Sequence, residues 1–271
     1  MSLNLSPIVR MPQVKVGREA FAPGERVVAE EMPIAMTYNG STHAVMMASP
    51  ADLEDFALGF SLSEGVIAAP DDLVSTEIIE HETGCEIRMW LSERRSASYQ
   101  MRRRALAGPI GCGLCGVESL AEVERPLPSI TSELQVSPEA IAGAMENLSD
   151  AQRLNREARA IHAAAFWRPE QGVVAIREDV GRHNALDKLA GALAARSEIC
   201  SDGAVLLTSR VSVEMVQKTA RMGAPLLIAI SAPTALAIRA AEGCGITLLA
   251  VARGDSFEVF THPQRVALTQ P

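Results

Sequence analysis

Short extended segments separated by turn residues dominate the first half of the chain. Residues 34–38 and 43–48 are apolar enough for strands, and Asn39-Gly40 between them predicts a tight hairpin, because both central residues of such a turn need positive φ. Ser49-Pro50 predicts the start of a helix, since serine accepts free backbone N–H groups and proline has none to lose. Gly65 is expected to end that helix. Further strands are predicted at 25–29, 76–82 and 86–91.

Strands and helices alternate along the second half. This alternation, with short links, predicts an α/β fold with a largely parallel sheet covered by helices. The predicted helices are 137–148, 184–196, 212–222 and 233–242, the last two ended by Gly223 and Gly243, and the predicted strands are 172–177, 204–208, 226–231 and 246–252. Prolines 126, 128 and 138 predict a linker. We therefore place a domain boundary near residue 130, between a smaller α+β domain (1–130) and an α/β domain (131–271).

The composition narrows the class of protein. The 271 residues are 48% hydrophobic, enough for a sizeable core, and the net charge of −8 disfavours sequence-specific binding of DNA or RNA. No apolar run approaches the ~18–20 residues of a membrane helix, and residues 1–17 lack the pattern of a secretory signal. Five cysteines, an odd number, favour reduced thiols over a disulfide framework. We expect a cytoplasmic protein with neither a membrane nor a nucleic-acid partner.

The segment from Gly111 to Gly116 reads Gly-Cys-Gly-Leu-Cys-Gly and carries the strongest chemical signal. Its glycines predict a loop whose backbone N–H groups can face a sulfur anion. We predict Cys112 and Cys115 as a catalytic pair, because one thiolate can carry sulfur while the other resolves or relays it. Two alternatives stay open. Half of a zinc site would need a second cysteine pair, and a thioredoxin-like redox pair would open a helix.

Polar residues gather at 177–184, between a predicted strand and a predicted helix. In parallel α/β sheets, ligands bind beyond the carboxyl ends of the strands. Arg182 is predicted to bind a phosphate, His183 to donate or accept a hydrogen bond, and Asn184 or Asp179 to read the edge of a base. Lys188 either points back to this site or is an ordinary solvated lysine.

Two later strand ends carry side chains of the same kinds. Ser209 and Arg210 follow the strand at 204–208, and residues 253–256 (Arg-Gly-Asp-Ser) follow the last apolar strand. Together with 177–184, these junctions favour a pocket for nucleotide phosphates, and ordinary polar loops are the alternative.

Several other reactive or charged residues allow two interpretations each. His162 lies among apolar residues, so it is either a core histidine or part of the site. The arginines within 94–104 form either a solvated face or an electropositive approach to the cysteine loop. Cys85, Cys200 and Cys244 are expected to be small buried residues or chance surface thiols.

Taken in order, these motifs resemble the FdhD/NarQ family. The resemblance covers nearly the whole chain, and the cysteine loop combined with the histidine–asparagine stretch makes it specific. The matching stretches are Ser49 to Phe60 with Glu64-Gly65, the Cys112/Cys115 loop, His162-Ala163-Ala164, Glu178 to Lys188, Ser231 to Thr234, Ala252-Arg253-Gly254 and Thr261-His262-Pro263. One departure is that Ala158 to Ile161 replaces a Thr-Gly-Gly run, which stiffens the backbone before His162.

The resemblance implies a sulfurtransferase that is required for formate dehydrogenase activity. It implies that Cys112 carries sulfur as a persulfide from a cysteine desulfurase to the molybdenum or tungsten bis(guanine dinucleotide) cofactor, with Cys115 as its companion. The cofactor is then a bound substrate, and no structural metal is expected. The resemblance also implies a homodimer and a cytidine-deaminase-like C-terminal domain. By this resemblance, the strand end with which the family binds its cofactor corresponds to Val251, Ala252, Arg253, Gly254, Asp255 and Ser256.

Three other functions stay open. The first is a non-enzymatic chaperone of the molybdenum cofactor, in which the cysteines only gate or clamp. The second is a zinc hydrolase or deaminase. Zinc deaminases pair His-x-Glu with a later Pro-Cys-x-x-Cys motif, whereas here His162 lacks the glutamate and the cysteine pair comes first. The third is a dithiol oxidoreductase.

Overall fold

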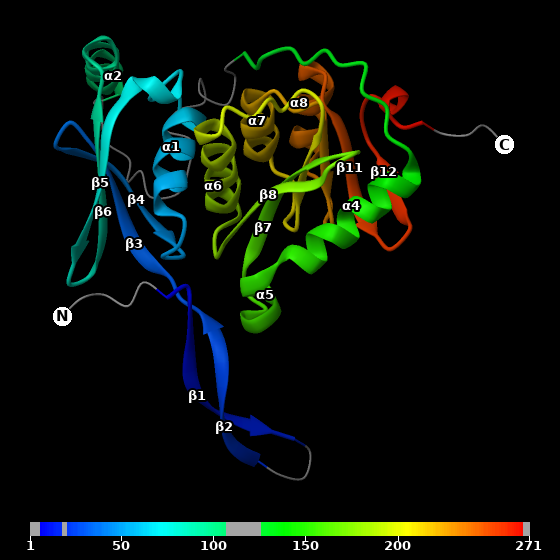
Figure 1. The fold of residues 1–271 in the computed structure, drawn as a ribbon, viewed down its shortest axis with the longest axis horizontal. Coiled ribbons are helices and arrows are strands. Elements are labelled where there is room, and N and C mark those ends of the chain that lie inside the picture. Colours follow the sequence, from blue (N-terminus) through cyan, green and yellow to red (C-terminus); the bar gives the residue numbers. More distant parts are fainter. Residues whose placement is uncertain (1–5, 18–20, 107–125, 268–271) are drawn as a thin grey trace.

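A computed structural model describes residues 6–17, 21–106 and 126–267 (Figure 1). Its strands form three sheets: a two-stranded ribbon, a four-stranded sheet and a six-stranded sheet. The ribbon pairs β1 (Ile8–Val16) with β2 (Phe21–Ala29) and projects away from the two larger sheets (Figure 1).

The four-stranded sheet has the order β4-β3-β6-β5. Asn39 and Gly40 have φ values of 50° and 75°, which confirms the predicted hairpin turn between β3 and β4. Helix α1 packs its apolar face on this sheet, and the core between them includes Ile34, Met36, Phe56 and Ile87. The elements of this part are β3 (Met32–Tyr38), β4 (Ser41–Ala48), α1 (Leu53–Ser63), η1 (Pro70–Asp72), β5 (Leu73–His81), β6 (Gly84–Leu91) and α2 (Glu93–Leu106).

The start of α1 differs from the prediction. The helix begins at Leu53 rather than at Ser49-Pro50, after Asp52 in the left-handed conformation (φ 51°). Ser49 has different partners, because its N–H donates to the Asp179 carboxylate at 3.0 Å and its hydroxyl accepts from the N–H of Val180 at 3.1 Å. A bond to a residue 130 positions away has thus replaced the local cap.

The six-stranded sheet confirms the α/β class. Its order is β12-β11-β10-β9-β7-β8, and the pairs β9–β10 and β10–β11 are parallel. The parallel pairing expected for most of the sheet is confined to these three strands, since β8, β9 and β12 each pair antiparallel with a neighbour. Three residues join β7 to β8, a link that suits a hairpin and is far too short for a parallel crossover. The strands are β7 (His162–Arg168), β8 (Gly172–Asp179), β9 (Ala204–Leu207), β10 (Leu226–Ala229), β11 (Thr247–Arg253) and β12 (Ser256–Val259).

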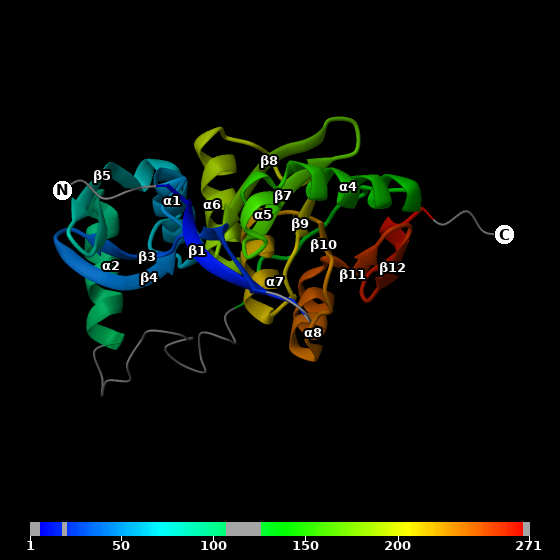
Figure 2. The ribbon, with the colours of Figure 1, turned by 90° about the horizontal axis from the view of Figure 1, so that it is seen from below.

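Helices cover both faces of this sheet, as expected. Helices α6, α7 and α8 pack on one face and α4 packs on the other (Figure 2). The helices are α4 (Pro138–Ala151), α5 (Arg153–Ala158), α6 (Arg182–Ala195), α7 (Val213–Met222), α8 (Ala235–Cys244) and the short η2 (Pro263–Arg265). The hydroxyl of Ser137 accepts from the N–H of Ala140, which confirms the predicted cap of α4. Helix α8 ends at Gly245 with φ 83° rather than at the predicted Gly243, because the left-handed residue lies two positions later.

The two larger sheets meet through α1 and α6, which lie side by side between them (Figure 1). A Cβ at Gly59 of α1 would lie 1.7 Å from the carbonyl oxygen of Asp187, and one at Gly191 of α6 would lie 1.9 Å from that of Asp55. Two helical backbones therefore touch at this crossing. Residues 126–135 form neither helix nor strand. The predicted boundary near residue 130 falls in that segment and stays a prediction.

Candidate functional site

The carboxyl ends of four strands share one edge of the six-stranded sheet. Strands β8, β9, β10 and β11 run in the same direction, because β7 is antiparallel to both β8 and β9. The residues predicted to contact the cofactor lie at or just after three of these ends: Asp179 and 182–184 at β8, 209–210 at β9, and 251–256 at β11. The sheet order separates the ends of β8 and β11 by four strand spacings, roughly 19 Å. Arg182 and Arg253 therefore lie on well-separated strands, which suits the binding of two separate anionic groups.

Arg182 and His183 form the first turn of α6. Gly181 is the N-cap, and no side chain caps the helix. His183 is 27% exposed, and its Nε2 lies 3.4 Å from the carboxylate of Glu214 on α7. Burial, followed by the nearby charges of Lys218 and Arg182, lowers the pKa of His183 to about 4. The imidazole is therefore neutral at pH 7 and can both donate and accept a hydrogen bond.

The low pKa of His183 predicts a stability that depends on pH. Its pKa falls from the ordinary value of 6.5 to about 4 on folding, so between these values the unfolded chain binds the proton and the folded chain does not. Stability is then lost as the pH falls, by about 2 kcal/mol between pH 7.5 and pH 5. Urea denaturation at the two pH values measures this loss. The His183→Gln variant should lose about 2 kcal/mol less over the same interval, and an identical loss in both proteins would contradict the prediction.

His162 lies at the same edge of the sheet. It begins β7 and pairs with Asp179 of β8. Burial and then the charge of Arg182 lower its pKa, while Asp179 opposes them. The structure thus places His162 beside the candidate site, a position that the sequence left open. In the stretch that replaces Thr-Gly-Gly, Arg159 has φ 56°, a left-handed conformation that glycine would adopt more readily.

Asp179 and Asn184 have a different role from the one predicted. Asp179 is 0% exposed and Asn184 is 3% exposed. The Asp179 carboxylate accepts hydrogen bonds from Lys188, Asn184 and two backbone N–H groups. Neither side chain reaches a surface from which it could read a base. Instead of reading a base, both side chains hold the turn before α6 in place, because their polar atoms already have partners inside the protein.

Lys188 points back to the 177–184 stretch, which was one of its two interpretations, but it binds Asp179 inside the protein rather than facing a surface. Its side chain is 0% exposed, and its Nζ lies 2.6 Å from Asp179 Oδ2 and 2.9 Å from the carbonyl oxygen of Ser49. It also lies 5.5 Å from the ring centroid of Phe56 on α1. Sequence reasoning missed this contact. The Ala/Leu composition of α6 on all sides was the available signal, because a helix that is apolar all round is buried.

The end of β9 offers one accessible side chain. Arg210 is exposed, whereas Ser209 is buried and its hydroxyl donates to the carbonyl oxygen of Arg210 at 3.0 Å. Ser209 therefore shapes the loop rather than facing solvent. The predicted contact with a ligand stays a prediction for Arg210.

The end of β11 is distorted. Val251 has φ 54°, which is rare for a β-branched residue and costs of order 1–3 kcal/mol. The register with β12 shifts between Ala250 and Arg253. Beyond this bulge, Arg253, Gly254, Asp255 and Ser256 are exposed, while Ala252 is buried. Strain of this kind gathers at functional sites, which is consistent with the predicted role of 251–256.

Two cavities lie in the described part of the chain, and the second reaches Arg177 and Glu178 near the carboxyl end of β8. One of about 570 Å³ is lined by residues of α1, α6 and α7, including Ser63, Lys218 and Arg221. The other, of about 700 Å³, lies between the start of α1, the α4–α5 junction and β8. None of the predicted contact residues lines either cavity.

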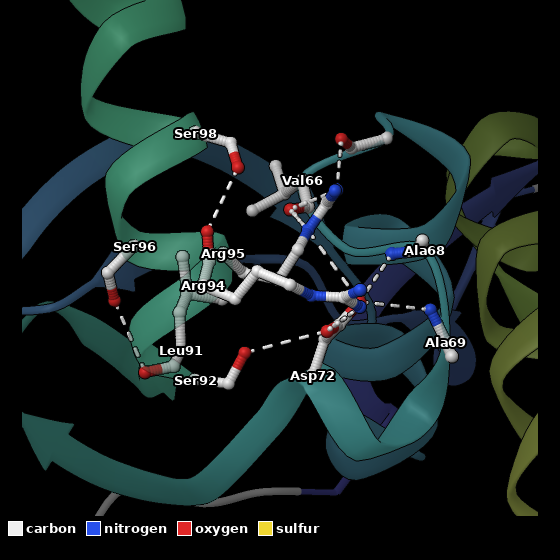
Figure 3. Close-up of polar contacts among 11 residues, drawn as sticks. Val66, Ala68, Ala69, Asp72, Leu91, Ser92, Arg94, Arg95, Ser96 and Ser98 are labelled. Atoms are coloured by element: carbon white, nitrogen blue, oxygen red, sulfur yellow. Dashed lines mark hydrogen bonds and ion pairs between the residues drawn. The ribbon is translucent and has the colours of Figure 1, made fainter.

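The arginine run near the cysteine loop is partly structural. Figure 3 shows Arg94 and Arg95 turned toward the buried carboxylate of Asp72. Arg95 also donates to the carbonyl oxygens of Gly65 and Val66. Burial opposes ionisation of Asp72, but the N–H groups of Ala68 and Ala69 and the guanidinium of Arg94 outweigh it and lower its pKa. The side chains of 102–104 lie outside the described residues.

None of the helices in the described residues is long and apolar enough to cross a membrane. Groups of three or more His, Cys, Asp or Glu side chains that could hold a metal ion are also absent from this part of the chain.

Comparison with known proteins decides the family. The model of the FdhD/NarQ family matches residues 29–267, which is most of the chain. The chain belongs to the FdhD/NarQ family. A protein of Agrobacterium fabrum named sulfur carrier protein FdhD is 53% identical over 248 residues, covering 91% of this chain and 92% of its own length. A protein of the same name from Cupriavidus necator is 50% identical and covers 92% of this chain and 86% of its own length.

The fold of this FdhD/NarQ member also occurs in a solved structure. The crystal structure of a putative formate dehydrogenase accessory protein from Desulfotalea psychrophila superimposes with a TM-score of 0.77. It covers 96% of this chain and 100% of its own, at 23% identity. This likeness supports the fold alone.

The cysteines of this family member divide into two groups. Cys112 and Cys115 lie outside the described residues, so their catalytic role stays a prediction. The three cysteines in the described residues are all buried, which confirms the expectation of small buried residues: Cys85, Cys200 and Cys244. Burial raises the pKa of all three thiols, that of Cys200 to about 11. They are therefore poor nucleophiles at neutral pH.

Proposed function

We propose that this FdhD/NarQ member is a sulfurtransferase. Cys112 accepts sulfur as a persulfide from a cysteine desulfurase and delivers it to a molybdenum or tungsten bis(guanine dinucleotide) cofactor required by formate dehydrogenase. The observation that carries this proposal is the membership of a family whose relatives are named sulfur carriers. The three buried, weakly acidic thiols support it, because they leave Cys112 and Cys115 as the candidates for a reactive thiolate.

The sulfur transfer proceeds by two exchanges at sulfur. The Cys112 thiolate attacks the outer sulfur of the desulfurase persulfide, and that S–S bond breaks to release the desulfurase thiolate. Cys115 then attacks the inner sulfur of the Cys112 persulfide. A Cys112–Cys115 disulfide forms, and the outer sulfur leaves as sulfide for the metal of the substrate. The two thiols thus supply the two electrons, and a dithiol reductant restores them.

The sheet edge binds the nucleotide ends of the substrate. Arg182 and Arg253 hold separate phosphates, which suits the roughly 19 Å between their strands. The neutral imidazole of His183 supplies a directional hydrogen bond beside Arg182.

Sulfur loading tests the chemistry. The purified protein is incubated with a cysteine desulfurase and L-cysteine, and added sulfur is mapped by mass spectrometry of peptides under non-reducing conditions. We expect a gain of one sulfur on Cys112, lost completely in Cys112→Ala and retained in the matched control Cys200→Ala, whose thiol is buried. No gain on either loop cysteine, with an active desulfurase and reduced thiols, would favour the chaperone function instead.

Nucleotide binding tests the site. Isothermal titration calorimetry with guanosine diphosphate should show two binding sites, one of which weakens about tenfold in Arg182→Ala and the other in Arg253→Ala, since each variant loses a charge-assisted hydrogen bond. Arg88→Ala, which removes a partly exposed arginine on the other sheet, is the control and should bind like the parent protein. A crystal structure with the nucleotide far from both arginines would exclude this site.

A further inference from the structure

Residues 179–184 form a turn that is held from within. The N–H of Gly181 and the side-chain amide of Asn184 both donate to Asp179 Oδ1, at 2.7 and 3.0 Å. A Cβ at Gly181 would lie 2.7 Å from Asn184 Nδ2, so glycine is required there by this contact. Arg182 and His183 follow directly and are only partly buried. Their immediate neighbours are thus fixed, while the two residues themselves stay partly accessible to solvent.

The same turn is bonded to the N-terminal part of the chain. Asn184 also donates to the carbonyl oxygen of Met47 at 2.9 Å, and the N–H of Ser49 donates to Asp179 Oδ2 at 3.0 Å. Lys188 joins both sides, because its Nζ donates to Asp179 and to the carbonyl oxygen of Ser49. Residues 47–49 comprise the end of β4 and the first residue after it, so this network ties the four-stranded sheet to the first turn of α6.

A buried ion pair of this kind contributes little net free energy to folding. Removing Lys188 and Asp179 from water costs much of what their attraction returns, and apolar replacements of similar size are often as stable. Such a pair instead fixes the positions of the groups around it. Four hydrogen-bond donors surround the two carboxylate oxygens of Asp179.

We propose that Lys188 and Asp179 are positioning residues, which orient Arg182 and His183 for the nucleotide by fixing the turn before α6 onto residues 47–49. This inference rests on the proposed function, because the site in question is the one that takes the guanine nucleotide. It assigns no contact with the ligand to either residue.

A double variant separates positioning from stability. Lys188→Met and Asp179→Asn each leave one buried charge without its partner, whereas Asp179→Asn combined with Lys188→Met removes both charges. The amide of the double variant has one acceptor oxygen where the carboxylate has two, so it cannot accept all the bonds that hold the turn. Arg168→Met is the matched control, because it breaks a polar cluster at the opposite end of β7.

The full-length variants are compared by urea denaturation and by calorimetry with guanosine diphosphate. We expect the double variant to regain part of the stability that the single variants lose, while its dissociation constant stays about tenfold or more above that of the parent protein. Arg168→Met should bind within about twofold. Recovery of nucleotide affinity together with stability in the double variant would overturn the proposal.

A second readout does not require the nucleotide. The imidazole of His183 can be titrated by NMR, with its signals assigned by comparison with His183→Gln. The charged groups of α6 and α7 near the His183 imidazole are Arg182, Glu214 and Lys218. All three are retained in the double variant. We expect the pKa of His183 to move from about 4 toward 6.5 in the double variant and to stay in Arg168→Met.

The two readouts distinguish the two hypotheses. If the parent protein does not bind guanosine diphosphate, the proposed nucleotide site fails, and the titration alone decides on positioning. An unchanged pKa of His183 in the double variant would then show that Lys188 and Asp179 do not orient the turn.

Discussion

Gly59→Ala is expected to lower the free energy of unfolding by about 3 kcal/mol or more, although alanine is the better helix former. The new Cβ would lie 1.7 Å from the carbonyl oxygen of Asp187, and Gly191→Ala would meet the carbonyl oxygen of Asp55 at 1.9 Å. Both obstructing atoms belong to a helix backbone, so no side chain can rotate away. Helices α1 and α6 must separate, which opens the contact through which the two larger sheets meet.

Gly143→Ala is the matched control for this prediction. Gly143 also lies inside a helix, α4, but a Cβ there meets no atom within 4 Å. The substitution should raise the free energy of unfolding by up to about 1 kcal/mol, since alanine loses less backbone entropy than glycine. Chemical denaturation followed by circular dichroism measures both variants. Stabilisation by Gly59→Ala would contradict the close approach of α1 and α6.

Lys188→Met should lower the free energy of unfolding by about 3–5 kcal/mol, because it leaves the Asp179 carboxylate buried without its cation. The carbonyl oxygen of Ser49 loses a donor as well. A partly exposed pair provides the comparison: Arg88 lies 2.8 Å from Glu86, with 37% and 16% of their side chains exposed. Arg88→Met should cost less than about 1 kcal/mol, because water screens that pair. Denaturation curves for the two variants that coincide would show that Lys188 does not carry a buried charge.

Local signals were enough wherever the structure depends on near neighbours. Asn39-Gly40 predicted its hairpin because positive φ is a property of the two residues themselves. Ser137 predicted the start of α4 because its hydroxyl bonds an N–H three residues later. The alternation of strands and helices in the second half predicted the α/β class in the same way.

The candidate site could be predicted only in part. Strand ends are visible in a sequence, so Arg182, Arg210 and Arg253 were found, and the sheet order then placed them along one edge. The lateral distance between them could not be predicted, because it depends on which strands lie between β8 and β11. The antiparallel pairs within the predicted largely parallel sheet could not be predicted either, because long-range contacts decide the direction of pairing.

The sequence by itself determined the α/β class and the motifs of the family, and it predicts the cysteine loop as the place of the sulfur chemistry. Only the tertiary structure decided the roles of Ser49, Asp179 and Lys188, which local rules read as a helix cap, a base reader and a lysine that either points back to the site or is solvated. The physical reason is separation along the chain, since Ser49 and Asp179 lie 130 residues apart and bond only when two sheets meet. The same holds for Gly59 and Gly191. The need for glycine at these helical positions appears only once the other helix backbone packs against them.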